Sequence, residues 1–273
     1  MNPRLSEYRP SLPLRSLVQS YWTGDFNLYS ENQFVQTVVP NGCIELIIHL
    51  TREQCELVKD NEWGKTPESM FIGLRTSAYN VRFDKLVRVF GIRFFPEGFY
   101  AAFGVSPSHF THSFEDCRDV LGQEFSEYCC RLRDLKDARA QVELTENYLL
   151  KMQSRRSARE DYLRLAPVII RRNNGTEPLE SVLKQLPVSL RQLQRGFKEK
   201  FGITAKEYTR LVRMNAIQKY MQSAMINLTD LTYEIGFADQ SHFIREFKLI
   251  TGISPRKFLD QRSEYIVNPA EED

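Results

Sequence analysis

The sequence predicts an α+β protein of two domains, in which a β-barrel with following helices precedes an all-helical domain. Three observations lead to this prediction. Short runs typical of β-strands end at Phe95, apolar residues recur at helical spacing after Glu97, and a polar, basic stretch at 151–160 separates two helical regions. A chain of 273 residues is also long enough for two cores of ordinary size.

The composition is that of a globular protein rather than a disordered or membrane-spanning one. Hydrophobic residues make up 42% of the chain and charged residues 26%. No apolar run approaches the roughly 20 residues of a membrane helix, because Glu45 and His49 interrupt the longest run, Ile44–Leu50. No apolar signal segment follows the first residues. We therefore expect a cytoplasmic protein with no membrane partner.

Charge is divided unevenly along the chain. Residues 160–262 hold 17 Lys and Arg against 11 Asp and Glu, a net charge of +6, whereas the rest of the chain has a net charge of −4. A basic C-terminal part beside an acidic remainder is typical of a nucleic-acid-binding module fused to another domain. This asymmetry is weak support by itself, because solvated helix faces are often basic.

The first domain is expected at residues 1–155, with the β-barrel at about 1–96. The dipeptide Asn41-Gly42 lies between two β-rich runs, Val35–Val39 and Cys43–Leu50, and it is typical of a tight turn. We therefore predict a β-hairpin there. Further strands are predicted at Met70–Leu74, Asn80–Phe83 and Leu86–Phe95.

Helices are predicted to follow the barrel, at about 97–150. Two of them fall within Asp116–Leu150. Their apolar sides carry Leu121, Phe125 and Cys129 in the first, and Val142, Tyr148 and Leu149 in the second. The polar stretch Lys151–Glu160 is then the natural linker to a second domain, which is expected at 160–262.

One face of the strand after the predicted turn carries polar side chains. Because side chains alternate between the two faces of a strand, the residues that share this face are Cys43, Glu45, Ile47 and His49. If the face lines the barrel interior, Glu45 and His49, together with Arg93, form a candidate effector pocket. A purely structural role for these side chains is the more common alternative.

The chain carries none of the patterns that mark a metal, cofactor or catalytic site. The four histidines form no HxH pair and the five cysteines form no CxxC pair. Neither a Ser-His-Asp arrangement nor a Gly-rich phosphate loop can be identified. We therefore expect no catalytic residue, no metal and no cofactor, and we interpret the cysteines as structural thiols in a reducing compartment.

The C-terminal part contains a degenerate duplication. In each copy a short amphipathic helix, a tight turn and a helix N-cap residue precede a second helix that ends in Phe-Lys. The copies span Leu179–Lys198 and Leu228–Lys248, and their N-cap residues are Ser189 and Asp239. Gln192 follows Ser189 by three residues, which is a capping-box pattern.

The second helix of each copy is predicted to bury one face and expose the other. The inward side chains are Leu190, Leu193 and Phe197 in the first copy and Phe243 and Phe247 in the second. Arg, Gln and Ser can bond to base edges, whereas Lys is better suited to phosphates. The candidate base contacts are the outward residues Arg191, Gln194, Arg195, Gln240, Ser241 and Arg245, and the candidate phosphate contacts are Ser189, Lys198, Asp239 and Lys248.

The stretch between the copies predicts a rigid connector. Thr204–Gln222 has uninterrupted helical character, and its 19 residues would form a helix about 28 Å long. One turn of DNA measures about 34 Å. A connector of this length could hold two recognition helices near successive major grooves. Either copy alone could be an ordinary solvated helix pair, but two copies in one chain favour DNA binding.

Residues from about Leu179 to Leu259 resemble the DNA-binding domain of the AraC/XylS family of bacterial regulators. The matching residues are Ser189-x-x-x-Leu193-Gln-Arg195-x-Phe197-Lys, Phe201-Gly202, Arg213, Ile235-Gly236-Phe237-x-Asp239-Gln-Ser-His-Phe243-x-Arg245-x-Phe247-Lys248 and Gly252-Ile-Ser-Pro255-x-x-Phe258. The block around Asp239 is the family's signature. The base-contacting positions of the family fall on the same six outward residues.

Both copies depart from the family pattern. Leu183 and Thr232 stand where the family usually has Ala, and Pro187 stands where it usually has Gly in the first turn. Leu183 is larger than the tight helix crossing normally tolerates, so we expect the first unit to be repacked.

The front half resembles a sensor-type domain that is found ahead of such DNA-binding domains. The similar stretches are Pro40–Leu50, Gly91–Pro96 and Phe103–Pro107. The resemblance implies a cupin-like β-barrel and a small-molecule effector. It also implies double-stranded DNA and RNA polymerase as partners, and a homodimer formed through the helices of Asp116–Leu150.

Together these observations predict a sequence-specific DNA-binding transcription regulator, with an N-terminal domain for effector sensing or dimerisation. Two alternatives stay open. One is a DNA-tethered scaffold without enzymatic activity, and the other is a small-molecule-modifying barrel fused to a DNA-binding tail.

Overall fold

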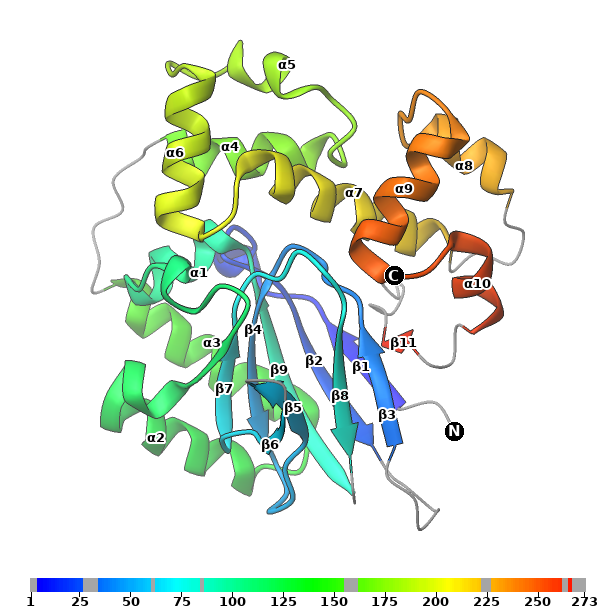
Figure 1. Ribbon diagram of the computed structural model, residues 1–273. Coiled ribbons are helices and arrows are strands. Elements are labelled where there is room, and N and C mark those ends of the chain that lie inside the picture. Colours follow the sequence, from blue (N-terminus) through cyan, green and yellow to red (C-terminus); the bar gives the residue numbers. More distant parts are fainter. Residues whose placement is uncertain are drawn as a thin grey trace.

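The computed structural model describes residues 4–26, 34–59, 62–83, 86–154, 162–221, 227–261 and 265–266. Two β-sheets form the front part of the molecule and helices form the rest, with the C-terminal helices above the sheets in Figure 1. The predicted α+β architecture, with a β-rich first domain and a helical second domain, is confirmed. Among the described residues, no helix has both the length and the apolar character needed to cross a membrane.

The larger sheet is antiparallel throughout. In spatial order its strands are β1 (Arg4–Tyr8), β2 (Val18–Phe26), β9 (Val87–Phe94), β4 (Ile44–His49), β7 (Ser69–Ile72) and β10 (Phe114–Asp116). Its central strands are apolar on both faces. Ile44 and Ile48 of β4 belong to the core that the sheet shares with the helices, whereas Ile47 packs on the core between the two sheets. Both faces must therefore be covered.

The smaller sheet covers one of these faces. Its strands are β11 (Tyr265–Ile266), β3 (Phe34–Val38), β8 (Tyr79–Phe83), β5 (Glu56–Lys59) and β6 (Glu62–Lys65). The strands are antiparallel except that β11 runs parallel to β3. The core between the sheets includes Phe26 and Phe83, whose stacked rings lie 4.2 Å apart.

The predicted hairpin at Asn41-Gly42 is wrong. β3 pairs with β8, whereas β4 pairs with β7 and β9, so the two flanking strands lie in different sheets. The turn itself forms as its residues predict, because Asn41 Oδ1 accepts a hydrogen bond from the Cys43 amide at 2.9 Å and Gly42 has a φ of 81°. Turn chemistry decides only the local reversal; the partner of each strand is decided by which face it buries.

Helices cover the other face of the larger sheet (Figure 1). They are α1 (Pro96–Phe103), α2 (Cys117–Asp134) and α3 (Ala138–Ser154), with short 3₁₀ turns at η1 (Leu12–Leu14) and η2 (Pro107–Phe110). The prediction of two helices within Asp116–Leu150 is confirmed. The contact with the sheet is aromatic: Phe71 of β7 meets Phe99 of α1 edge-on, with ring centroids 4.9 Å apart.

The C-terminal domain consists of seven described helices and ends on a strand. The helices are α4 (Tyr162–Arg172), α5 (Leu179–Leu183), α6 (Leu190–Phe201), α7 (Ala205–Tyr220), α8 (Leu228–Glu234), α9 (Gln240–Thr251) and α10 (Pro255–Asp260). The expectation that only helices follow the linker is wrong at β11, which returns to the smaller sheet. The predicted linker begins inside α3, and both of its proposed domain limits, 155 and 160, lie outside the described residues.

A buried ion pair joins the two domains. Arg171 of α4 donates hydrogen bonds to both carboxylate oxygens of Glu97 in α1 and, at 2.8 Å, to the hydroxyl of Tyr208 in α7. The Glu97 side chain is 5% exposed, and the Arg171 guanidinium lies 3.8 Å from the centre of the Phe95 ring. One arginine therefore connects the barrel domain, the first helix of the second domain and the connector helix.

We predict that Glu97→Gln destabilises the protein by about 3–5 kcal/mol, because the buried Arg171 cation would lose its counter-charge. The free energy of unfolding in urea measures this. Asp25→Asn is the matched control, because the Asp25–Arg88 pair is about half exposed and is expected to contribute about 1 kcal/mol or less. An equally small effect of both substitutions would show that the interdomain ion pair is not a major stabilising contact.

Candidate nucleic-acid interface and effector cavity

Two helix-turn-helix units stand at the ends of α7: α5 with α6, and α8 with α9. Both predicted N-caps form. Ser189 and Gln192 make the reciprocal bonds of a capping box, and Asp239 Oδ1 accepts a hydrogen bond from the His242 amide at 2.8 Å. The two caps begin α6 and α9 at the residues that the duplication predicted.

The inward faces of α6 and α9 follow the prediction with one exception. Leu193, Phe197, Phe243 and Phe247 are buried, at 1% exposure or less. Leu190, the first residue of α6, is 41% exposed. The prediction that Leu190 is buried is therefore wrong. A side chain at the very start of a helix has no preceding turn to pack against, although helical periodicity places it on the apolar face.

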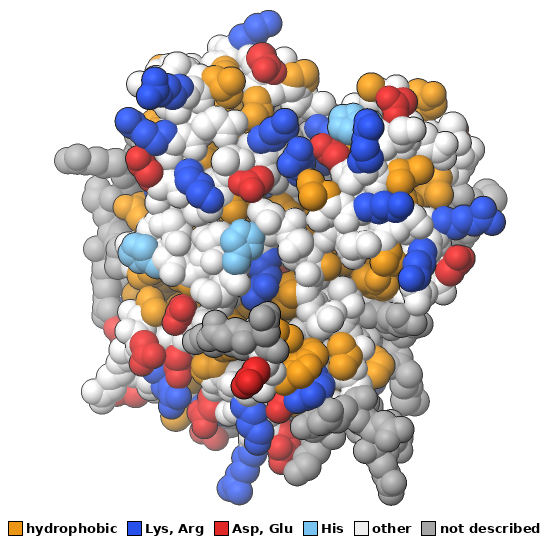
Figure 2. All heavy atoms as spheres, in the orientation of Figure 1, with side chains coloured by type: hydrophobic (Ala, Val, Ile, Leu, Met, Phe, Trp, Pro, Cys, Tyr) orange, Lys and Arg blue, Asp and Glu red, His pale blue; other side chains and the backbone are white. Residues whose placement is uncertain are grey.

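The outward faces of α6 and α9 carry the predicted DNA contacts. Lys and Arg side chains gather over the helical upper part of the molecule, in the region of α6 and α9 (Figure 2). The exposed residues among them are Arg191, Arg195, Lys198, Gln240, Ser241, Arg245 and Lys248, together with the N-caps Ser189 and Asp239. Two cationic surfaces of this kind, held on one rigid domain, fit a polyanion such as DNA.

Three of the outward side chains of α6 already have partners. The Gln194 side-chain oxygen accepts a hydrogen bond from the Ala205 amide at 3.1 Å and so supports the start of α7. Lys198 Nζ donates to the Gly202 carbonyl at the end of its own helix, at 2.8 Å. Arg195 Nε lies 3.6 Å from Glu199, but both side chains are about 70% exposed, so this pair is weak and easily exchanged for another anion.

The connector α7 is held at its start and at its middle. A capping box of Thr204 and Glu207 begins it, and its 16 residues make a helix about 24 Å long. In the middle of α7, Arg213 donates to the Gly175 carbonyl at 2.8 Å and pairs with Glu246 of α9 at 3.3 Å. The family pattern in the sequence includes Arg213 but does not identify its partner Glu246. The one sequence feature that could have indicated Glu246 is that it is a carboxylate within a basic helix.

The two units differ where the sequence departs from the family. Thr232 in α8 is buried, and its hydroxyl donates to the Leu228 carbonyl at 2.7 Å. In α5 the neighbouring Val182 is the buried residue, Leu183 is only half-buried and Pro187 is exposed. α5 has 5 residues against 7 in α8, so the first unit has the shorter first helix.

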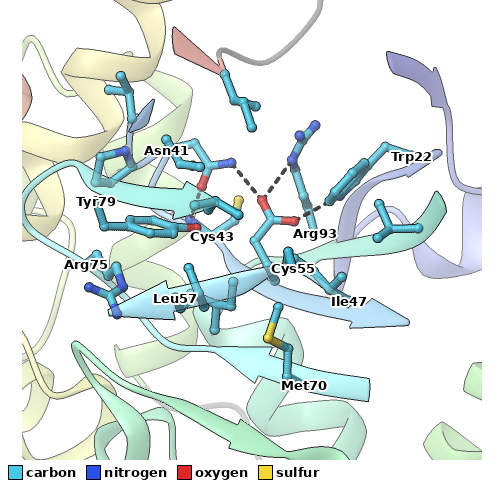
Figure 3. A pocket seen from close by; sticks show the side chains of 18 of the residues that line it. Trp22, Asn41, Cys43, Ile47, Cys55, Leu57, Met70, Arg75, Tyr79 and Arg93 are labelled. Atoms are coloured by element: carbon cyan, nitrogen blue, oxygen red, sulfur yellow. Dashed lines mark hydrogen bonds and ion pairs between the residues drawn. The ribbon is translucent and has the colours of Figure 1, made fainter. Parts of the chain in front are cut away.

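A cavity of about 80 Å³, counted as the space open to the centre of a water molecule, lies between the two sheets. Cys43, Glu45 and Ile47 line it, as predicted for that face of β4, and so does Arg93 of β9. His49, the third candidate pocket residue, is not part of the wall. Most of the remaining wall is apolar, and Figure 3 shows Leu57, Ile47 and Met70 pointing into the space.

The charged groups Glu45 and Arg93 neutralise each other. Arg93 Nε donates to Glu45 at 2.9 Å, and a second nitrogen donates to Glu7 of β1 at 2.6 Å. Asn41 and the Trp22 indole also donate to the Glu45 carboxylate, at 3.2 and 2.9 Å (Figure 3). Because every carboxylate oxygen of Glu45 already accepts a hydrogen bond, this network is structurally satisfied without a ligand.

His49 and Cys55 form a buried neutral pair. His49 Nε2 lies 3.3 Å from the Cys55 amide, and Nδ1 lies 3.2 Å from the Glu68 carbonyl. Burial lowers the pKa of His49 to about 4 and raises the pKa of the Cys55 thiol to about 11. Both shifts oppose a thiolate–imidazolium pair, so the contact of 3.4 Å between Sγ and Nε2 does not supply an activated nucleophile.

Comparison with known proteins finds two separate family matches, one in the front part of the chain and one in the C-terminal part. Residues 182–261 match a helix-turn-helix domain, and residues 6–116 match a domain of unknown function. The chain is 30% identical over 87 residues to the HTH-type transcriptional activator RhaS of Escherichia coli O1:K1 / APEC. This match covers 32% of the chain and 31% of RhaS, so it spans about a third of the curated relative's length.

The fold is shared with a solved protein, ToxT. ToxT from Vibrio cholerae O395 aligns with 89% of this chain and 98% of its own, with a TM-score of 0.50 at 12% identity. A second ToxT structure, also with a TM-score of 0.50 at 12% identity, is bound to (E)-4-(8-methylnaphthalen-1-yl)but-3-enoic acid and covers 88% of this chain and 98% of its own. At this identity the likeness establishes the two-domain fold.

We predict that His49 makes the protein less stable in acid. The pKa of His49 is about 4 in the folded protein, against about 6.5 in an unfolded chain, so the unfolded chain binds more protons between these values. The contribution is fully present above pH 6.5 and is lost as the pH falls towards 4, to a total of about 3 kcal/mol. The decrease in melting temperature from pH 7 to pH 4.5 measures it.

His49→Gln should reduce this decrease, and substitution of the exposed His109 by Gln serves as the control. Carboxylates contribute equally to the acid loss in all three proteins, so only the difference between them reports on His49. If the wild type and His49→Gln lose the same number of degrees, the protonation of His49 does not limit acid stability.

Proposed function

Because residues 182–261 form a helix-turn-helix domain of the AraC type, we propose that this chain is a sequence-specific DNA-binding transcription regulator. α6 and α9 are its recognition helices, placed in successive major-groove segments. The observation that carries the proposal is that both units repeat one arrangement. Each has a recognition helix with an N-cap and with exposed Arg side chains on its outer face. The inner face buries a Leu-Phe pair in the first unit and a Phe pair in the second.

The proposed base contacts are the outward residues near the start of each recognition helix. Arg is suited to bidentate bonds with guanine, and Gln to adenine. The proposed set is Arg191, Gln194, Arg195, Gln240, Ser241 and Arg245, with Gln194 using its amide nitrogen while its oxygen supports α7. Lys198, Lys248 and the capped helix starts at Ser189 and Asp239 would contact phosphates.

The N-terminal domain is proposed to sense a small-molecule effector. Its cavity lies between two sheets and is enclosed by side chains from both, as effector pockets in β-rich domains are. ToxT, which has the same fold, is bound to an organic acid in one solved structure, and this supports a small-molecule effector here. The neutral Cys55–His49 pair favours sensing over chemical modification of the effector, so we propose a protein without enzymatic activity.

The proposed regulator function implies further partners. RNA polymerase is the proposed protein partner, since a transcription regulator acts on the enzyme that transcribes its target. Homodimerisation is proposed through α2 and α3, which lie on the flank of the sheet in Figure 1. A bacterial regulator of this kind would act in the cytoplasm, where the chromosome is.

We predict that the purified full chain enriches a DNA motif of two parts, about one helical turn apart, from random-sequence duplexes. Arg195→Ala and Arg245→Ala should each weaken binding to the selected motif by about 1–3 kcal/mol and leave binding to random duplex nearly unchanged. The dissociation constants on the two duplexes at one fixed salt concentration measure the difference.

Lys248→Ala is the matched control, because it removes an exposed cation from the same helix as Arg245. It should weaken binding to both duplexes equally and reduce the salt slope by about 1. Enrichment of a one-part motif would mean that the first unit does not read bases. The absence of any motif would contradict the proposed function.

A further inference from the structure

Arg75 differs from the other charged groups of the cavity wall because no described residue supplies its counter-charge. Arg93 is neutralised by two carboxylates, and Glu45 accepts hydrogen bonds from three donors. Arg75 lies in the loop after β7 and lines the same cavity. None of the carboxylates in the described part of the chain pairs with it, and its buried Nε has no hydrogen-bond partner there.

The surroundings of Arg75 fix its position without satisfying its charge. Its guanidinium stacks on the Tyr79 ring at 4.4 Å from the ring centre, which orients the plane of the group. Figure 3 places Arg75 and Tyr79 at one end of the cavity, and Arg93 and Trp22 at the other. A guanidinium that is half-buried, oriented and unpaired can offer parallel N–H donors to an entering anion.

The rest of the wall is suited to an apolar body. The apolar side chains that line it come from both sheets and from β11: Leu5, Phe26, Val38, Val39, Ile47, Leu57, Met70, Ile72, Val81, Phe83, Val89 and Ile266. Arg93 is shared by the carboxylates of Glu45 and Glu7, so Arg75 is the one cation without an ion pair among the described residues of the wall. One anionic group on an otherwise apolar molecule is the ligand chemistry that this wall complements.

The loop that carries Arg75 also touches the second recognition helix. Ala78, three residues after Arg75, donates its amide hydrogen to the Ile250 carbonyl of α9 at 2.6 Å. On the other side of the cavity, Ile266 of β11 is part of the wall, and its neighbour Tyr265 packs on Phe258 of α10 with ring centroids 4.7 Å apart. Two short segments therefore connect the cavity to the second helix-turn-helix unit.

We propose that the cavity binds a mainly apolar molecule with a single anionic group, that Arg75 binds the anion, and that this contact steadies the loop holding α9. The inference rests on the proposed effector role of the N-terminal domain and names its ligand class. A ligand at Arg75 anchors residues 73–78, so the Ala78–Ile250 bond opens less often. Occupancy of the cavity thus changes how firmly the second recognition helix is held to the barrel domain.

The first test compares two molecules of the same shape, cyclohexanecarboxylate and cyclohexanecarboxamide, by calorimetric titration of the full chain without DNA. The carboxylate should bind at least tenfold more tightly than the uncharged amide. Arg75→Gln should remove this preference and leave the affinity for the amide within twofold. Arg88→Gln is the control, because it deletes an exposed arginine of the same domain that does not line the cavity, and it should preserve the preference.

Equal affinities for the two molecules, no binding of either, or a preference that survives Arg75→Gln would each overturn the proposal. These outcomes are separate from the DNA selection. If the protein enriches a DNA motif but shows no preference for the carboxylate, the proposed regulator function stands and the proposed ligand class is wrong. If the protein prefers the carboxylate but enriches no DNA motif, the proposed ligand class stands and the proposed regulator function is wrong.

The second test follows amide hydrogen exchange in a peptide that includes Ala78. Saturating cyclohexanecarboxylate should slow its exchange at least threefold in the wild type, whereas the carboxamide and the Arg75→Gln variant should show no slowing. Slowing of equal size in the wild type and the variant, or none in either, would show that anion binding does not reach the loop that holds α9.

Discussion

The constraint on which the rest of the structure depends is the larger sheet, whose central strands are apolar on both faces. Such a sheet cannot leave either face in water, so it needs a layer on each side. The smaller sheet covers one face and leaves a cavity between the two layers. Helices cover the other face, and α1 among them brings Glu97 to the position where Arg171 of the second domain meets it. The cavity between the sheets and the attachment of the helix-turn-helix domain thus have one origin.

The attachment is made at several points that differ in strength. The bidentate Glu97–Arg171 pair is buried and extends to Tyr208 of the connector, so it fixes the first part of the C-terminal domain. The second helix-turn-helix unit is held to the connector by the Arg213–Glu246 pair, and its described contacts with the first domain include one backbone bond from Ala78. The two-residue strand β11, which follows α10, adds a further attachment to the smaller sheet. Contacts of this size open at lower free-energy cost than a packed core. The unit that is attached more weakly is also the one whose attachments touch the cavity.

Charges in this protein fall into two groups, and the distinction indicates where a ligand or DNA can bind. Arg93, Arg171 and Arg213 each contact a carboxylate inside the fold and act structurally. Arg191 and Arg245 are exposed on the recognition helices, and Arg75 is half-buried with no counter-charge among the residues that the structure describes. A cation that the fold does not neutralise is available to a phosphate or to the anion of a ligand.

The sequence by itself determined the elements whose signals are local. Helical periodicity and N-cap chemistry located α6 and α9, because a cap and an apolar stripe act within a few residues. The alternation along β4 grouped Glu45 with Cys43 and Ile47, and all three line the cavity. Only the tertiary structure decided the pairing of β3 and β4 in different sheets, the return of β11, and the exclusion of His49 from the cavity wall. These features depend on contacts between residues far apart in the chain. Local propensity does not specify which distant strand, carbonyl or cation a segment will contact.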